Sequence, residues 1–267
     1  MVSLEVLTQT FEELWPISLS DEWDRPGLAF GSKSAEISKV LLTVDVTAAV
    51  LNEAKQLGAQ LVLAHHPVLL RGVTELGEQT IKGNMATFAI KNDIAVFSAH
   101  TNSDRAEVGT ATAMAAALGV EIIEALDPIT GHGLVAKLQT PESLLSLSTR
   151  LAKLLPSVAA GIKVAGDPEL EIGKIAVAPG AGDSFMTSAL ESGADVFITS
   201  DLRHHPAQDF LENNELGRAI ALIDVSHWAA ESLWLPLAQK ELMKRHPQVQ
   251  FILSDVRTDP WDFAVMQ

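Results

Sequence analysis

The spacing of apolar residues predicts an amphipathic helix at the start of the chain, followed by a βαβ unit. Leu4, Leu7, Phe11 and Leu14 recur at helical intervals and stop ahead of Pro16, which cannot continue a helix. The next apolar runs predict these elements in order: a strand at Val40–Val44, a helix capped by Thr47 and running to Leu57 with Gly58 as its stop, and a strand at Leu61–Ala64. A helix between two strands is typical of a parallel sheet.

The alternation of helices and strands continues to residue 126. The pattern predicts, in order, a helix around Met85–Lys91, a strand at Ile94–Ser98 and an alanine-rich helix at Gly109–Leu118. Asp127-Pro128 and the glycines at 131 and 133 then indicate a boundary. Strands that alternate with helices in this way indicate an α/β fold.

The second half of the chain repeats the first. Ile37 matches Ile172, and the dipeptide Gly58-Ala59 matches Gly193-Ala194, both at an offset of 135 residues. Each Gly-Ala opens an apolar strand, and a His-His-Pro tripeptide follows each of those strands. Several matches in one order favour duplication of an α/β unit, although chance similarity between two βαβ units is the alternative.

We therefore predict an α/β fold of duplicated three-layer α/β/α units that face each other across a metal-binding cleft. The first unit comprises residues 1–126 and the second comprises residues 127–267. A last strand at Val249–Leu253 fits either sheet, so it can return to the first one. Ligands of open α/β sheets bind at the carboxyl ends of the strands, and we expect the chemistry there.

Composition narrows the possible partners and metal ligands. The chain has 34 acidic and 19 basic residues, a formal net charge of −15, which disfavours nonspecific binding to nucleic acid or to an anionic membrane. It has no cysteine, so a metal site would use His, Asp and Glu. The acidic first 15 residues do not resemble a signal peptide, and no apolar run reaches membrane-spanning length. We expect a cytoplasmic protein.

His65 and His66 are the central candidates for metal binding. They end the apolar run that begins at Gly58, so we expect a buried strand to carry two imidazoles to its carboxyl end. Neutral imidazole is the commonest metal ligand, and two adjacent residues at a strand end can serve two neighbouring ions. A loop with two exposed histidines fits the dipeptide equally well.

Further candidate ligands follow other strands. His227 and Glu231 are four residues apart, so in a helix they share one face and can bind one metal, or they form an ordinary surface pair. Asp104 adds a carboxylate, unless it only caps a helix or forms an Asx turn. Such a set suits two zinc, manganese or iron ions about 3.5 to 4 Å apart, bridged by a water of lowered pKa.

The loop Pro179–Phe185 offers a weaker site. Free backbone amides around Gly180, Gly182 and Ser184 can bind an anionic group of a substrate. The loop lacks the phosphate-binding glycine motifs, and Asp183 would repel an anion, so a tight structural turn fits this segment better.

A second polar cluster follows the repeated strand in the second half. Asp201, Arg203, His204 and His205 suit substrate binding or proton transfer, or equally a solvated loop. The candidates for orienting metal ligands or moving protons are Asp45, His100, His204 and His205. No general base can be chosen among them.

Seven motifs in fixed order carry a family resemblance. They are LLTVDVT, GAQLVLAHHP, SAHTNSDRAE, GAGDSF, GADVFITSDLRHHPAQD, LIDVSHWAAE and RTDPW. Together they span nearly the whole chain, which resembles the Nif-three-like family, whose members are often labelled GTP cyclohydrolase type 2 homologues. DEWDRPGL resembles the family's amino-terminal segment, with departures at Arg25 and Pro26, and the second polar cluster departs from the family pattern at Ser200 and Pro206.

The resemblance implies two similar α/β units, a dinuclear metal centre and a ring-shaped homohexamer. It places the family's metal ligands on the five residues that spacing also selects, namely His65, His66, Asp104, His227 and Glu231. It also implies that the long central insertion of some members is absent, because only residues 127–171 separate the two halves.

These observations predict a metal-dependent hydrolase in which two divalent ions activate a water for attack on a nucleotide or another cyclic amide-type substrate. The family label would make the reaction the opening of the guanine imidazole ring of GTP with release of formate. The alternative is a noncatalytic metal-binding scaffold that presents surfaces to protein partners. A catalytic site keeps an open coordination position, whereas a structural site is closed.

Overall fold

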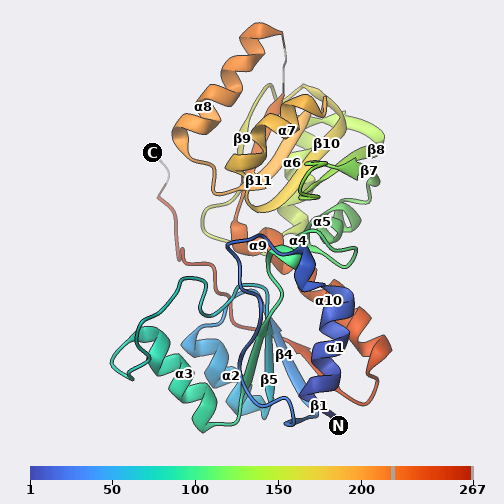
Figure 1. The fold of residues 1–267 in the computed structure, drawn as a ribbon. Helices are drawn as coiled ribbons and strands as arrows, with labels where there is room; N and C mark the ends of the chain where they lie inside the picture. Colours follow the sequence, from blue (N-terminus) through green and yellow to red (C-terminus); the bar gives the residue numbers. More distant parts are fainter. Residues whose placement is uncertain (218–219, 266–267) are drawn as a thin grey trace. The chain divides into compact units, whose positions relative to one another are not determined.

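The computed structural model describes residues 1–217 and 220–265 and divides the chain into two compact units (Figure 1). Unit 1 comprises residues 1–109 and 234–258, and unit 2 comprises residues 110–233 and the segment that starts at Asp259. The sequence had suggested one boundary, at residue 126. The helix at 110–118 packs on the second sheet, so unit 2 begins ahead of that boundary. The strand at 250–253 pairs in the first sheet, one of the two places predicted for it.

Unit 1 is built on a five-stranded sheet with the strand order β13-β4-β5-β6-β2. Its elements are β1 (Val2–Ser3), α1 (Leu4–Leu14), η1 (Ile17–Leu19), β2 (Gly27–Phe30), β3 (Glu36–Ile37), β4 (Lys39–Thr43), α2 (Ala48–Leu57), β5 (Leu61–Ala64), α3 (Ile81–Lys91), β6 (Ala95–Ser98), α4 (Thr101–Asp104), α10 (Trp234–Arg245) and β13 (Gln250–Leu253). Strands β13, β4, β5 and β6 are parallel, and β2 is antiparallel to β6. β1 and β3 form a separate antiparallel pair.

Helices cover both faces of this sheet. Figure 1 shows α2 and α3 on one side of β4 and β5, and α1 and α10 on the other. Val62 and Ala64 belong to the core under α2 and α3, whereas Leu61 and Leu63, equally buried, point to the opposite face because strand residues alternate. On that face Phe11 of α1 packs against Phe97, with ring centroids 4.8 Å apart. Unit 1 therefore has three α/β/α layers.

The local signals of the first βαβ unit are confirmed. The backbone N–H of Val50 donates to Thr47 Oγ1 at 3.2 Å, which caps α2, and Gly58 ends the helix in a left-handed conformation with φ 65°. The helix predicted from Met85 begins earlier, at Ile81, because Thr80 caps it there. An amphipathic period marks the middle of a helix more clearly than its first turn.

Unit 2 is built on a six-stranded sheet with the strand order β7-β8-β10-β11-β12-β9. Its elements are α5 (Thr110–Leu118), β7 (Glu121–Ala125), β8 (Leu134–Ser143), α6 (Leu144–Leu154), β9 (Lys163–Ala165), β10 (Glu171–Ala181), η2 (Asp183–Phe185), α7 (Met186–Glu191), β11 (Val196–Ser200), α8 (His204–Glu212), η3 (Asn213–Leu216), β12 (Ala221–Val225) and α9 (His227–Ser232). Strands β10, β11 and β12 are parallel, and the other three are antiparallel to their neighbours.

The second sheet also lies between two helical layers. Val196 and Ile198 of β11 join the core that includes residues of α5, α6 and α9, and Phe197 between them joins the core under α7 and α8. The alternation of adjacent strand residues between two cores confirms a sheet that is buried on both faces. No helix in the described ranges is long and apolar enough to cross a membrane.

The same local contact occurs within each unit, at positions that are 135 residues apart in the sequence. In unit 1 the N–H of Lys39 donates to Gln60 Oε1 at 3.0 Å, and in unit 2 the N–H of Lys174 donates to Asp195 Oδ2 at 2.8 Å. Both residue pairs are related by the same offset. In each unit the lysine ammonium also donates to a carbonyl just before the Gly-Ala dipeptide that leads into the next strand. Equivalent contacts at equivalent positions support duplication of one ancestral unit.

Candidate metal centre

Neighbouring strand ends bring three histidines of unit 1 together. His65 and His66 directly follow β5, and His100 lies two residues after β6. Because β5 and β6 are parallel neighbours, their carboxyl ends lie at the same edge of the sheet. The three ring centroids are 4.9 to 5.4 Å apart, and one donor nitrogen from each ring lies within 4.8 Å of the other two. This unit 1 histidine group can therefore hold a metal ion.

Each ring of the group has an oxygen atom close to its Nδ1 atom, in a hydrogen bond for His65 and His66 and at ion-pair distance for His100. The three contacts are His65 Nδ1 to the carbonyl of Ala99 at 2.9 Å, His66 Nδ1 to Asp45 Oδ1 at 2.7 Å, and His100 Nδ1 to Asp24 Oδ2 at 3.0 Å. An imidazole that donates through Nδ1 keeps its lone pair on Nε2. Metal-binding histidines are typically held in this way, by a carbonyl or carboxylate on the other nitrogen.

Asp24 is a buried anchor for His100 that the sequence did not identify. The N–H and the hydroxyl of Thr101 donate to Asp24 Oδ2 at 3.2 and 2.7 Å, and the N–H of Arg25 donates to Oδ1 at 2.8 Å. Burial raises the pKa of the Asp24 carboxyl, but the hydrogen bonds from His100 and Thr101 outweigh it and hold the pKa at about 2. The signal was present, because Asp24 lies in the family-like segment DEWDRPGL.

Asp45 orients His66 and is itself held from the far end of the chain. Its Oδ2 atom accepts a hydrogen bond from Thr258 Oγ1 at 2.5 Å. Asp45 was among the predicted orienting residues, and the geometry places it in contact with His66. Thr258 was missed, although it belongs to the RTDPW motif.

Asp104 lies beside the most deeply buried histidine. Its Oδ1 atom is 3.7 Å from Nε2 of His65, whose side chain is 0% exposed. Asp104 is the last residue of the short helix α4. Next to it, Ser103 Oγ lies 3.2 Å from His65 Nδ1 and donates to the carbonyl of Ala99 at 2.9 Å. The structure thus brings the predicted ligands His65 and Asp104 close together.

Unit 2 contains a second donor set at the end of β12. His227 begins α9, and its Nε2 atom lies 2.9 Å from Glu231 Oε1 one turn later. Its Nδ1 atom lies 2.7 Å from Asp201 Oδ2. Asp201 has φ 56°, a left-handed conformation that is uncommon for a residue other than glycine. His227 and Glu231 therefore share one helical face as predicted, and Asp201 orients the ring.

Two carboxylates around His227 favour its charged form. Burial lowers the pKa of the imidazole, but the charge of Glu231 and the hydrogen bonds to Asp201 and Glu231 raise it to about 11. The hydrogen bond from His227 in turn lowers the pKa of Asp201. The environment is thus built to stabilise a positive charge between two carboxylates, which a metal cation can also provide.

The glycine loop predicted at residues 179–185 supports Glu231 by close packing, although β10 extends through Ala181 and so includes Gly180. A Cβ at Gly180 would lie 2.8 Å from Glu231 Oε1, and a Cβ at Gly182 would lie 1.8 Å from Thr199 Oγ1. Both glycines are therefore required by the close approach of the backbone to its neighbours. Ser184, the third residue of the predicted anion site, lies in the short helix η2.

Arg203, His204 and His205 are the remaining members of the second polar cluster, and their contacts differ from those of Asp201. Arg203 pairs with Asp183 of the glycine loop. His204 and His205 are exposed at the start of α8, with ring centroids 5.1 Å apart. The second His-His-Pro tripeptide therefore begins a helix, whereas the first one follows a strand.

A family model described as Duf34/NIF3 (NGG1p interacting factor 3) matches residues 2–260. The chain belongs to the Duf34/NIF3 family. A Streptomyces coelicolor relative named GTP cyclohydrolase 1 type 2 homolog is 39% identical, over 96% of this chain and 92% of that protein. A Clostridium perfringens relative of the same name is 31% identical, over 98% and 100% of the two chains. These matches confirm the family that the motifs indicated.

A solved structure supports the Duf34/NIF3 fold of this chain. The crystal structure of a Bacillus cereus protein related to NIF3 matches with a TM-score of 0.89 at 22% sequence identity, over 99% of this chain and all of that one. At this identity the likeness concerns the fold, and it agrees with the mixed α/β sheets described above.

Proposed function

We propose that this Duf34/NIF3 protein binds divalent metal ions and uses them to hydrolyse a nucleotide or another cyclic amide-type substrate. The observation that supports the proposal most is the common orientation of four histidines. In His65, His66, His100 and His227, the Nδ1 atom lies 2.7 to 3.0 Å from an oxygen acceptor. Solvent-facing histidines have no reason to share this arrangement, whereas metal ligands do.

The residues fit two separate donor sets, one in each unit. The unit 1 histidine group would hold one ion, with Asp104 as a carboxylate beside His65. His227 and Glu231, whose Nε2 and Oε1 atoms are 2.9 Å apart, would contribute to a second. We therefore infer two divalent ions per chain. Imidazole and carboxylate donors suit zinc, manganese or iron.

The chain's own residues would orient the ligands and hold charge. A bound divalent ion supplies Lewis acidity and lowers the pKa of a coordinated water. Asp45, Asp24 and Asp201 fix the imidazole rings and make them better donors. The relatives' name makes GTP the first substrate to test. We also propose a homohexamer on the family resemblance, which light scattering of the purified protein will test.

Elemental analysis of purified variants tests the metal-binding part. We expect His65→Ala/His66→Ala to lose bound metal. The matched control is His204→Ala/His205→Ala, which changes the same tripeptide where it is exposed, and it should retain the metal. Because His65 is fully buried, circular dichroism must show that the first variant is folded. Equal metal content in a folded double variant and the wild type would overturn the proposal.

Hydrolysis assays test the catalytic part. Metal-reconstituted protein is incubated with GTP and a panel of cyclic amides, and products are separated by chromatography. Activity that requires metal and disappears in His65→Ala/His66→Ala supports the proposal. An inactive protein with saturated metal sites would instead favour the noncatalytic scaffold.

A further inference from the structure

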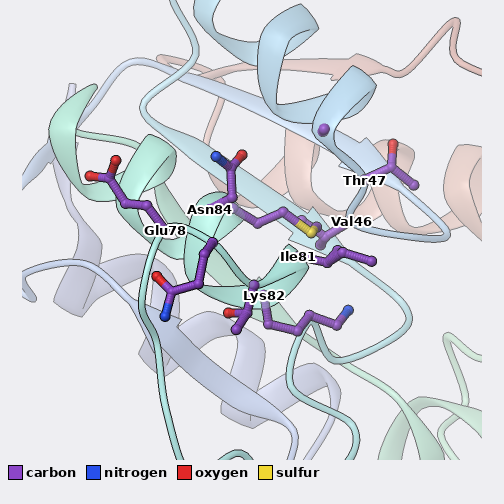
Figure 2. Close-up of a pocket in the computed structure, with 10 residues that line it drawn as sticks. Val46, Thr47, Glu78, Ile81, Lys82 and Asn84 are labelled. Atoms are coloured by element: carbon purple, nitrogen blue, oxygen red, sulfur yellow. The ribbon is translucent and has the colours of Figure 1, made fainter.

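A cavity of about 570 Å³ lies beside the turn that follows Asp45, at the carboxyl end of β4 (Figure 2). One wall is the turn after β4, residues 46–48, and the other comes from residues 78–85 at the start of α3. Val46 directly follows Asp45, and the second wall lies where the loop that begins with His65 and His66 enters α3. The size is in the usual range of small-molecule sites. Its place matches the crevice where open α/β sheets bind ligands.

One side chain that lines this cavity carries a positive charge. Lys82 lines the cavity and is half-buried, and it forms no ion pair within the described part of the chain. The acidic side chain of the cavity, Glu78, is paired instead with Lys91 at 2.6 Å. Lys82 therefore leaves a positive charge at the cavity that an anionic group of a ligand can contact.

The rest of the lining suits a molecule with an apolar ring and polar edges. Met85 and Val46 are buried at the cavity wall, and Ile81 is 79% exposed there. Gln79 and Asn84 add amide groups that can donate and accept hydrogen bonds. Figure 2 shows the side chains of Ile81 and Lys82 extending in the same direction from the start of α3. An apolar surface therefore lies beside the charge.

The wall that carries Lys82 is held in place before any ligand binds. Gly83, the next residue, packs so closely that a Cβ there would lie 2.0 Å from the carbonyl oxygen of Gly77. Its N–H donates to Thr80 Oγ1 at 3.0 Å, and the hydroxyl of Thr80 donates to the carbonyl of Gly77 at 2.9 Å. A fixed backbone lowers the entropic cost of binding.

We propose that this cavity binds the substrate of the metal-dependent reaction, and that the substrate is a phosphate ester whose phosphate contacts Lys82. The inference rests on the proposed function for the reaction, but the cavity can be tested without it. The apolar wall formed by Ile81 and Met85 would contact the ring of the substrate, and the amides would contact its polar edge. Val46, beside Asp45, would face the end of the substrate nearest the unit 1 histidine group.

Binding of guanosine 5′-monophosphate, guanosine and inorganic phosphate to the full chain tests the proposal. Titration calorimetry is done at constant salt on protein stripped with EDTA and on zinc-loaded protein. We expect the monophosphate to bind more tightly than either guanosine or phosphate. Lys82→Met should weaken it by roughly tenfold or more without changing guanosine binding, and Lys82→Arg should restore part of the affinity. Lys240→Met, an exposed lysine on α10, removes the same charge elsewhere and should have no effect.

Several outcomes would overturn the cavity assignment. They are no binding of the monophosphate by the wild type, equal affinity in Lys82→Met and Lys240→Met, or equal affinity for inorganic phosphate and the monophosphate. The zinc content of the wild type and of Lys82→Met, measured on the same samples, separates the cavity proposal from the metal-dependent reaction. A Lys82-dependent affinity in a protein that binds no zinc would reject the metal-dependent reaction and retain the cavity as a phosphate-ester site. Normal zinc binding without Lys82 dependence would reject only the cavity.

Discussion

Gly180→Ala tests the role of Glu231 without changing any metal donor. The backbone of Gly180 is left-handed, with φ +85°, and an added Cβ would lie 2.8 Å from Glu231 Oε1 and 3.8 Å from His227 Nε2. The substitution therefore places one methyl group against the carboxylate that we propose as a ligand. Gly193→Ala is the matched control, because φ is +67° there and no atom lies within 4 Å of the added Cβ.

The two substitutions share one energetic term and differ in another. A left-handed alanine costs about 1 to 2 kcal/mol at either position. Only at Gly180 must a neighbour also move, by about 0.6 Å, which is the difference between the 2.8 Å separation and the 3.4 Å at which ordinary contact begins. Metal–ligand distances tolerate only about 0.2 Å. We therefore expect Gly180→Ala to weaken metal binding at least tenfold, or by about 1.4 kcal/mol.

Zinc titration of EDTA-treated protein by calorimetry measures the effect, and urea unfolding of the same samples measures stability. Both variants should lose a similar amount of stability, because the atom that must move at Gly180 is the end of the Glu231 side chain and can shift at low cost. Only Gly180→Ala should lose zinc affinity. Glu231→Gln provides the benchmark for loss of the carboxylate charge. If folded Gly180→Ala binds zinc as tightly as Gly193→Ala, the glycine loop does not position a metal ligand and the reasoning is refuted.

Two further predictions concern an orienting carboxylate and a buried histidine. Asp45→Asn should lower zinc affinity about 10- to 100-fold, because the carboxylate that holds His66 is lost; unchanged affinity in a chelator competition would contradict its role. Burial, then the charge of Arg245, lowers the pKa of His246, whose Nε2 lies 2.8 Å from Thr10 Oγ1. Below pH about 6.5 the unfolded state binds the proton more readily, so stability should be full above that pH and fall as pH decreases toward the lowered pKa. His246→Gln should flatten this part of the urea-unfolding profile, and an identical pH dependence would refute the assignment.

Local sequence signals predicted the framework of unit 1 well. A threonine cap and a glycine stop define α2 at both ends, because these residues satisfy backbone groups that no other part of the helix can. The apolar run before His65 predicted a buried strand, and β5 confirms it. Each of these signals depends only on residues close together in the chain, so it can be identified without knowledge of the tertiary structure.

The orienting contacts could not be predicted in the same way. Asp24 meets His100, and Thr258 meets Asp45 from 213 positions away. Neither residue is close in sequence to its partner, and only packing of the whole unit brings them together. The division into units could not be predicted from local signals either, because it depends on which sheet the 110–118 helix and the 250–253 strand join.

The second His-His-Pro tripeptide shows how one motif takes two structures. In unit 1, β5 ends directly before His65, and the tripeptide leaves the strand. In unit 2, β11 ends at Ser200, and the tripeptide begins α8 at His204. Proline is tolerated in the first turn of a helix, where its missing N–H has no intrahelical partner. The motif alone therefore cannot tell a strand end from a helix start.

Comparison of strand ends indicates how the duplicated units diverged. His100 and His227 occupy corresponding places, two residues after the third parallel strand of each unit, and each ring meets a carboxylate through Nδ1. At the 135-residue offset, Asp201 of unit 2 corresponds to His66 of unit 1, just after the second parallel strand of each unit. A carboxylate that orients His227 therefore occupies the position in unit 2 where unit 1 has a candidate metal ligand. In unit 1, Asp24 from the amino-terminal loop contacts His100 instead, and position 66 carries an imidazole, so three histidines gather there, whereas in unit 2 His227 is paired with Glu231.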